Sequence, residues 1–234
     1  MDLNRMESNE KVGWDLLWEK KGNEIKDFDP VKLNGFDNDA CEFNKDFVKI
    51  VTDIIKSKLE LFKKDSLLEV GCGAGMLLIP LSKNVKESSG VDLSNSLIKR
   101  LKEHLKEANL AVSGANKLPF EQNSFNKIFV HSVFQYFQSS DYAKQAILEM
   151  IRVCKPNGKI LIMDIPDLGK KEDSDHFREK FNNKTSDPNL QHRFYSKDFF
   201  KEICKENNLK YKIWNQNIEG YKNSEFRFNV LMDV

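Results

Sequence analysis

Three glycines, Gly71, Gly73 and Gly75, occupy alternate positions directly after a short apolar run at residues 66–70. Glycine has no Cβ, so a turn rich in glycine can take positive φ angles and let a ligand lie against the backbone. Such a turn is weak evidence alone, because many strands end in tight turns. Asp92 ends the next apolar run, where its carboxylate can accept hydrogen bonds from both hydroxyls of a ribose. Together these residues predict a site for a nucleoside-like ligand.

The spacing of the glycines separates two classes of nucleoside ligand. Dinucleotide-binding folds use G-x-G-x-x-G, in which the third glycine packs a helix against a strand. Met76 stands at the position of that third glycine, and Glu69 stands two residues before the first one. The spacing therefore disfavours a dinucleotide, and with it a nicotinamide-dependent oxidoreductase.

The elements that must hold this turn are indicated by hydrophobic spacing. Residues 43–59 carry apolar side chains at helical intervals. Short apolar runs then alternate with amphipathic segments up to residue 165, and a helix at 196–208 and strands at 209–216 and 224–232 follow. Strands separated by helices form parallel sheets. We expect an α/β fold with a Rossmann-like, doubly wound, seven-stranded, mostly parallel sheet, an antiparallel terminal hairpin and helices on both faces.

The N-terminal segment differs from the rest of the chain, because DFDP and NGFDNDA interrupt any regular pattern there. We expect residues 1–45 to form a cap or lid and residues 46–234 to form the main domain, which contains the glycine turn and Asp92. Trp14 and Trp18 would lie on one face of a helix in this segment. The cap can then fold over the sheet and exclude water, although plain packing of the two rings within the cap is the simpler alternative.

Charge and cysteine usage limit the partners and the setting. With 37 basic and 36 acidic residues the net charge is +1, so no long-range field favours nucleic acid as a partner. The four cysteines are far apart and form no C-x-x-C pair, and no signal peptide precedes them. No apolar run approaches the roughly 20 residues of a membrane span. We expect a cytoplasmic protein with no metal site and no membrane contact.

From residue 65 to residue 165 the sequence resembles the class I S-adenosylmethionine-dependent methyltransferases, of the type 11/25-like kind. The first motif of that family reads E/D-x-G-x-G-x-G, and Glu69 and the three glycines match it. The stretches LPFEQNSFNKIFVHSVFQYF and AILEMIRVCKPNGKILIMDI continue the resemblance in register, which makes it specific. The resemblance implies S-adenosylmethionine as the cofactor and S-adenosylhomocysteine as its product.

The resemblance also implies roles along the cofactor. Glu69 would order the glycine turn near the amino-acid part, Asp92 would hold the ribose, and Leu93 would cover one face of the adenine. Cys72 is expected to be a small filler of the turn and not a nucleophile, since no positive partner is near it in sequence. The cofactor-binding residues implied in this way are Glu69, Gly71, Cys72, Gly73, Gly75, Asp92, Leu93, Gly114, Ala115, Asn116 and His131.

Two positions depart from the family pattern. Gly114 stands where relatives commonly carry an aspartate that accepts from the adenine amino group, so Asn116 or water would have to supply that bond. Asn126 replaces an aspartate at the start of the fourth strand and removes a charge. One lost neutral hydrogen bond costs about 0.5–1.5 kcal/mol, roughly a tenfold change in affinity at most. We expect cofactor binding to persist.

Methyl transfer from a sulfonium is an in-line displacement, so the protein mainly has to align donor and acceptor. His131, at the end of the fourth strand, is the candidate general base for a hydroxyl acceptor. The alternative is that it contacts the cofactor without taking a proton. The residues expected around the acceptor, from the cap, the strand ends and the late loops, are Trp14, Trp18, Gln135, Tyr136, Asp164, Arg193, Tyr195 and Tyr221.

The expected acceptor is a small polar molecule, a sugar-like or other metabolite with a hydroxyl or an amine. The sequence lacks the N/D-P-P-Y/F motif of enzymes that methylate amino groups of bases. Two alternatives stay open at this point. One is a methyltransferase that acts on a protein or an RNA. The other is a catalytically silent cofactor-binding partner or scaffold protein, which the departures at Gly114 and Asn126 favour.

Overall fold

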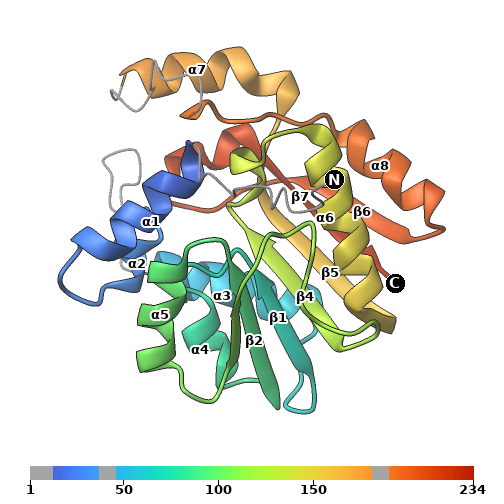
Figure 1. Cartoon of the computed structure of the whole chain (residues 1–234). Helices are drawn as coiled ribbons and strands as arrows, with labels where there is room; N and C mark the ends of the chain where they lie inside the picture. The colour runs from blue at the N-terminus through green and yellow to red at the C-terminus, as the bar shows by residue number, and fades with distance from the viewer. Residues whose placement is uncertain (1–12, 37–45, 181–189) are drawn as a thin grey trace, which may run out of the picture.

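The computed structural model describes residues 13–36, 46–180 and 190–234. Its centre is a sheet of seven strands in the order β3-β2-β1-β4-β5-β7-β6 (Figure 1). The first five of these are parallel, and β7 runs antiparallel to both β5 and β6. The strands are β1 Ser66–Val70, β2 Glu87–Asp92, β3 Asn109–Val112, β4 Phe125–His131, β5 Cys154–Pro166, β6 Lys210–Asn215 and β7 Arg227–Asp233. The predicted sheet and its antiparallel end are confirmed.

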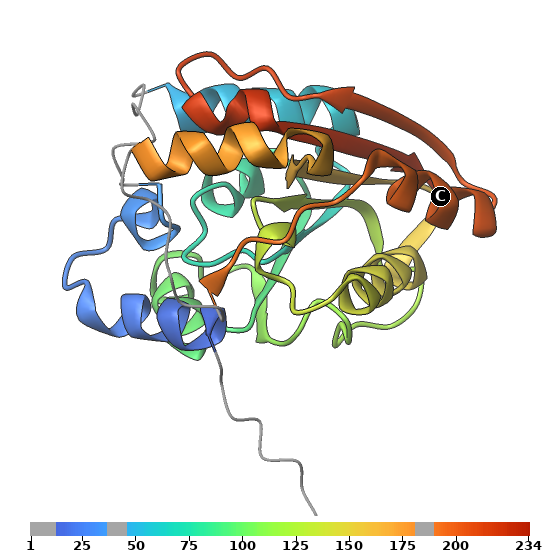
Figure 2. The same cartoon turned by 90° about the horizontal axis from the view of Figure 1, so that it is seen from above.

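Helices cover both faces of the sheet, as predicted, with α3 on one side of the strands and α6 on the other (Figure 2). The α-helices are α1 Trp14–Glu24, α2 Pro30–Leu33, α3 Phe47–Leu59, α4 Leu78–Ser82, α5 Asn95–His104, α6 Ser140–Val153, α7 Lys171–Lys180 and α8 Lys197–Glu206. Short 3-10 turns are η1 Phe134–Tyr136, η2 Leu168–Lys170 and η4 Lys222–Phe226. The helix predicted over residues 43–59 is described from Phe47, and its first residues lie outside the described ranges.

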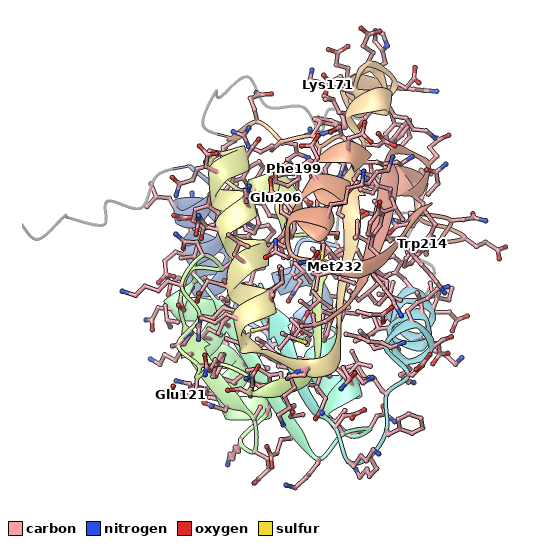
Figure 3. The ribbon with its side chains drawn as sticks, turned by 90° about the vertical axis from the view of Figure 1, so that its right-hand side faces the viewer. Glu121, Lys171, Phe199, Glu206, Trp214 and Met232 are labelled. Carbon is pink, nitrogen blue, oxygen red and sulfur yellow. The ribbon has the colours of Figure 1, made fainter. Side chains whose placement is uncertain are left out.

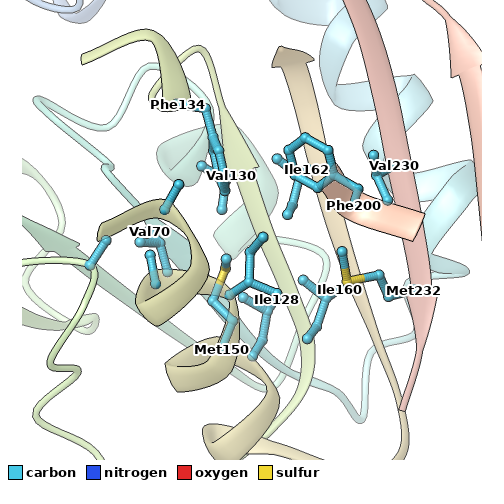
Figure 4. Close-up of a cluster of buried hydrophobic side chains, with 14 of the residues drawn as sticks. Val70, Ile128, Val130, Phe134, Met150, Ile160, Ile162, Phe200, Val230 and Met232 are labelled. Atoms are coloured by element: carbon cyan, nitrogen blue, oxygen red, sulfur yellow. The ribbon is translucent and has the colours of Figure 1, made fainter. Parts of the chain in front are cut away.

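Alternating side chains of the central strands build two cores, because successive residues of a strand point to opposite faces. Ile128 of β4 packs with Met150 of α6 and Phe200 of α8 on one face (Figure 4). Phe129, the next residue, packs with Ile55 of α3 on the other face. Strands buried on both faces are held rigidly, so their carboxyl ends form a fixed edge on which a site can be built.

The outer surfaces of α6 and α8 add little to this core. Lys144 of α6 forms an ion pair at 2.7 Å with Glu206 of α8, and Glu206 is labelled in Figure 3. Both side chains are exposed, and exposed ion pairs contribute about 0–1 kcal/mol. The apolar faces of the two helices therefore carry their attachment to the sheet.

Helix α1 docks on the start of α5 through polar contacts. Glu19 Oε2 accepts a hydrogen bond from Ser94 Oγ at 3.0 Å and from the Ser96 N–H at 3.2 Å. Arg100 of α5 donates to the carbonyl of Gly22 at 3.3 Å. These contacts fix α1 beside the carboxyl end of β2.

The boundary between a cap at 1–45 and a domain at 46–234 stays a prediction. Residues 1–12 and 37–45 of the expected cap lie outside the described residues. Among the helices of the described ranges, none combines the length and the apolar character that crossing a bilayer requires.

Candidate active site

A pocket with about 900 Å³ of empty space opens at the carboxyl ends of β1, β2 and β4, beneath α1. Ligands of doubly wound sheets bind at this edge. The predicted site residues that line the pocket are Trp14, Trp18, Glu69, Gly71, Gly73, Asp92, Leu93, Ala115, His131 and Tyr136. The structure thus brings residues of the expected cofactor side and of the expected acceptor side into one cavity.

The turn after β1 needs its glycines for backbone reasons. Gly71 has φ 77° and Gly73 has φ 52°, in the left-handed region that side chains disfavour. A Cβ on Gly71 would lie 2.4 Å from Val133 Cγ2. The bare backbone here is therefore required by the fold as well as by the wall of the pocket.

Asp92 ties this turn to the end of β2. Its Oδ2 accepts a hydrogen bond from the Gly73 N–H at 2.8 Å, and its Oδ1 accepts from the Ser94 N–H at 2.9 Å. Burial raises the pKa of Asp92, and these two backbone donors oppose the rise. A carboxylate has about four lone-pair sites, so Asp92 keeps acceptor capacity toward the pocket.

Asn34, beside the end of α2, closes the other side of the turn, and sequence reasoning did not single it out. Its Oδ1 accepts from the Ala74 N–H at 2.9 Å, and its Nδ2 donates to the Cys72 carbonyl at 3.2 Å. Asn34 also lines the pocket. The only local signal was the dipeptide Asn34-Gly35, which indicates a turn but no long-range contact.

Glu69 is buried in the pocket wall, 2% exposed. Burial raises the pKa of Glu69 well above its ordinary value, and the nearby charge of Asp92 raises it further, while the backbone N–H of Leu78 opposes both. Within the described part of the chain, its Oε2 has no hydrogen-bond partner. A buried acceptor without a partner is rare. It fits a ligand that brings a cationic or N–H donor, as the amino-acid part of S-adenosylmethionine would.

The departure at Gly114 has a structural counterpart. A Cβ on Gly114 would lie 2.7 Å from Asn116 Oδ1 and 2.9 Å from the Tyr142 hydroxyl, so these two side chains occupy the space of the missing aspartate. Tyr142 of α6 lines the pocket beside Ala115, although no sequence motif indicated this residue. Burial raises the pKa of Tyr142, and the backbone N–H groups of Asn116 and Ala115 oppose the rise.

His131 forms the opposite wall of the pocket at the end of β4. It is 5% exposed, and no described residue forms a hydrogen bond with its Nε2. Burial lowers the pKa of His131 below its ordinary value of 6.5, and the charge of Asp164 only partly offsets this. The imidazole is therefore neutral at pH 7 and able to accept a proton.

Aromatic rings surround the acceptor side of the cavity. The Tyr136 ring lies 4.7 Å from the Trp14 ring and 5.4 Å from the Trp18 ring. Phe36 lies 5.7 Å from His131. The two tryptophans thus face the pocket and do not only pack within the N-terminal segment.

Four residues expected at the cofactor lie outside the pocket lining. Cys72 is packed among Leu78, Ile98, Leu101 and Leu110, and burial raises the pKa of its thiol well above the ordinary value, as suits a filler. Gly75 serves helix packing, since a Cβ there would lie 2.5 Å from Leu101 Cδ1. Gly114 and Asn116 lie just behind Ala115. Their contacts with the cofactor stay predictions.

Five residues expected at the acceptor also lie outside the lining: Gln135, Asp164, Arg193, Tyr195 and Tyr221. Arg193 Nε donates to the Phe137 carbonyl at 3.1 Å, and the Tyr195 hydroxyl donates to the Phe134 carbonyl at 2.9 Å. These two side chains brace the segment after β4. Asp164 and Tyr221 bond to each other at 3.1 Å, behind His131.

Asn126, the second departure, lies far from the pocket. Its Oδ1 accepts hydrogen bonds from the Ser66 N–H at 3.2 Å and from the Ser66 hydroxyl at 3.0 Å. Ser66 is the first residue of β1 and Asn126 the second residue of β4, at the edge opposite to the carboxyl ends. Asn126 therefore takes part in the pairing of β1 with β4, and a small effect on the cofactor site stays a prediction.

Comparison with known proteins relates part of this chain to a protein family. Residues 68–162 match the family described as "Methyltransferase domain". The probable methyltransferase ltbC of Aspergillus luteorubrus is 30% identical over 115 residues, which cover 44% of this chain and 40% of that protein. The demethylmenaquinone methyltransferase of Staphylococcus aureus is 34% identical over 108 residues, covering 44% of each protein. This chain spans less than half the length of these curated relatives.

A solved structure extends the likeness to almost the whole chain. Phosphoethanolamine N-methyltransferase 1 of Haemonchus contortus, in complex with phosphoethanolamine and S-adenosylhomocysteine, superposes with a TM-score of 0.70 at 13% identity. The superposition covers 93% of this chain and 47% of that one. At this identity the likeness concerns the fold.

Residues 68–162, which contribute the glycine turn and Asp92 to this site, match a methyltransferase domain, and the sheet order is that of the class I methyltransferase fold. The domain is of the S-adenosylmethionine-dependent kind, as the sequence resemblance implied, and S-adenosylmethionine is the cofactor of such a domain.

Proposed function

We propose that this protein transfers a methyl group from S-adenosylmethionine to a small polar acceptor. The supporting observation is the single pocket that joins Glu69, Asp92 and the glycine turn with His131 and the rings beneath α1. The lining combines polar groups suited to a nucleoside-like cofactor with aromatic rings suited to a small acceptor. Helix α1 covers the opening, which disfavours a folded macromolecule as the acceptor.

The residues that line the pocket have distinct roles in this proposal. Asp92 binds the ribose and Glu69 binds the amino-acid end of the cofactor, which supplies the methyl group on a positively charged sulfur. Trp14 and Trp18 exclude water and hold the acceptor against Tyr136. His131 takes the proton that an acceptor hydroxyl loses as its oxygen forms the new bond to carbon.

We expect replacement of His131 by alanine to lower kcat about 10²- to 10⁴-fold when the acceptor is a hydroxyl, the usual contribution of a general base. Binding of S-adenosylhomocysteine, measured by calorimetry, should stay within a few-fold of wild type, because Asp92 and the glycine turn are untouched. His104, which stacks on Phe28 at 3.5 Å on the far side of α5, offers a matched control as His104→Ala. An unchanged kcat in His131→Ala would rule out the base.

The direct test of the function is incubation with methyl-labelled S-adenosylmethionine and a size-fractionated cell extract. The proposal expects the label in the small-molecule fraction, and expects Asp92→Ala to abolish it. Label in protein or RNA would show that the acceptor is a macromolecule, although the methyl transfer itself would stand. Cofactor binding without label in any fraction would favour a catalytically silent partner protein.

A further inference from the structure

A group of buried polar side chains lies behind the His131 wall of the pocket, close to α7. We call it the polar cluster, and its members are the buried Gln135, Asp164, Arg178, Gln216 and Arg227 and the half-buried His192. They come from segments far apart in the sequence: the turn after β4, the end of β5, α7, the segment before α8, the residue after β6 and the start of β7 (Figure 1). Helix α7 closes over them by packing Phe177 against Phe226 of η4 at 5.4 Å.

Asp164 is the central, firmly positioned residue of the polar cluster. It is fully buried, has φ 61°, and lies where the register between β5 and β7 shifts. Its Oδ1 accepts from Gln216 Nε2 at 2.8 Å, and its Oδ2 accepts from the Tyr221 hydroxyl at 3.1 Å. An unusual backbone angle near a strand end and a buried carboxylate with a hydrogen bond on each oxygen are typical of a built site.

Arg227 is the member with the largest unmet bonding capacity. It is 3% exposed, and its Nε lies 3.5 Å from Asp164 Oδ1. Among the residues that the structure describes, none forms a hydrogen bond with its Nε or its Nη1. A buried guanidinium with unbonded N–H groups is costly, more so than a neutral group. An acceptor-rich ligand at this point would remove that cost.

A second cation increases the positive charge of the cluster. Arg178 of α7 is 8% exposed, and its pKa is lowered by burial first and then by the charge of Arg227. Asp175, on the same helix, opposes this effect, but its carboxylate is also paired with Lys171 at 2.8 Å. Arg178, Arg227 and Asp164 are thus three buried charged groups in this part of the molecule, and Arg227 pairs with Asp164 at 3.5 Å.

The polar cluster adjoins the pocket in which the methyl group would be transferred. The His192 ring lies 5.5 Å from the Tyr136 ring and 5.2 Å from the Trp14 ring, and both of these line the pocket. Burial raises the pKa of Tyr136, and the charges of Arg227 and Arg178 partly oppose this rise. The polar cluster therefore lies against the wall of the pocket that Tyr136 and Trp14 form.

We propose that the methyl acceptor carries an oxoanion, a carboxylate or a phosphate group, which binds the guanidinium of Arg227 with the charge of Arg178 beside it. This proposal rests on the proposed methyl transfer and names the substrate class for it. Arginine presents a planar set of donors that matches the oxygens of both groups. A neutral sugar would bring no negative charge to Arg227, whose Nε and Nη1 have no hydrogen-bond partner among the described residues.

The test uses the full chain saturated with S-adenosylhomocysteine. Inorganic phosphate or acetate is added in increasing concentration at constant ionic strength, and the melting temperature is measured. We expect the melting temperature of wild type to rise saturably with at least one of these anions, and which of them acts distinguishes phosphate from carboxylate. Arg227→Gln should weaken the apparent anion affinity at least tenfold. Lys144→Gln removes an exposed cation of α6 and should leave that affinity unchanged.

Binding of S-adenosylhomocysteine distinguishes a variant that has lost its fold from one that has lost only the anion site. Arg227→Gln should bind S-adenosylhomocysteine within twofold of wild type, because the glycine turn and Asp92 are intact. Should this variant fail to fold, Arg178→Gln, whose side chain comes from a different element, decides by the same titration. No saturable anion effect in wild type, or an unchanged anion affinity in the folded variant, overturns the proposal.

The product of the labelling assay gives an independent result. Mass spectrometry of the labelled small molecule is expected to show a carboxyl or phosphate group. A labelled product with neither group overturns the oxoanion proposal and leaves the methyl transfer standing. Absence of any labelled product contradicts the methyl transfer instead, while the anion titration still decides whether the polar cluster binds an oxoanion.

Discussion

Replacing Asp92 with alanine is expected to weaken binding of S-adenosylhomocysteine at least about 100-fold. A hydrogen bond to a charged group is worth about 1.5–3 kcal/mol, and 1.4 kcal/mol corresponds to a factor of ten in affinity. The variant loses the bonds to the ribose hydroxyls. It also releases the Gly73 N–H, which Asp92 holds at 2.8 Å, so the wall of the pocket itself loosens. Titration calorimetry measures both the affinity and the binding enthalpy.

Two further variants make this result specific. Asp92→Asn keeps one acceptor oxygen and should fall between wild type and alanine. Asp198→Ala removes an exposed carboxylate that pairs with Lys201 on α8, and should bind S-adenosylhomocysteine like wild type. Equal affinity in wild type and Asp92→Ala would show that the ribose is held elsewhere. Binding of NAD that depends on Asp92 would point to the dinucleotide reading instead.

The sequence predicted the fold well because the fold depends on local patterns. Strands buried on both faces are continuous apolar runs, such as residues 66–70 and 158–163, and amphipathic helices separate them. This alternation restricts the topology to a doubly wound sheet. The terminal hairpin was predictable for the same reason, since a short connection joins β6 and β7.

The cofactor side of the site was predictable to the extent that it depends on backbone. Gly71, Gly73 and Asp92 belong to two neighbouring strand ends, so their sequence positions place them together. Asn34 and Tyr142 reach the same pocket from α2 and α6, and only tertiary packing brings them there. The periodicity of a single sequence does not reveal that these two side chains reach the pocket.

The acceptor side was predicted less accurately, because strand-end loops fix where a residue lies but not where its side chain points. Tyr195 was expected at the acceptor, yet its hydroxyl bonds to the Phe134 carbonyl inside the α6 core. Arg227 was not singled out, since an arginine at the start of an end strand is ordinarily exposed. Arg227 is buried where α7 packs on η4. The highly charged sequence of α7 did not indicate that this helix would pack there.

Glu69→Gln is expected to remove a pH dependence from both stability and cofactor binding. The pKa of Glu69 is raised in the folded protein, so the folded state holds its proton more tightly than the unfolded chain. Its stabilising contribution is complete below the ordinary carboxyl pKa and is lost as pH rises toward the raised value, by up to about 1.4 kcal/mol per pH unit. The free energy of unfolding of Glu69→Gln, measured with urea, should therefore exceed that of wild type by a margin that grows with pH.

Cofactor binding should show the opposite preference, because a cationic ligand favours the ionised form of Glu69. Wild type is expected to bind S-adenosylhomocysteine more tightly as pH rises and to release a proton, which calorimetry in two buffers of different ionisation enthalpy detects. Glu69→Gln should bind about tenfold or more weakly at pH 8 and release no proton. Glu87→Gln, at an exposed carboxylate paired with Lys86, should behave like wild type. Equal proton release by Glu69→Gln and wild type would mean that the buried carboxyl does not meet the cationic end of the cofactor.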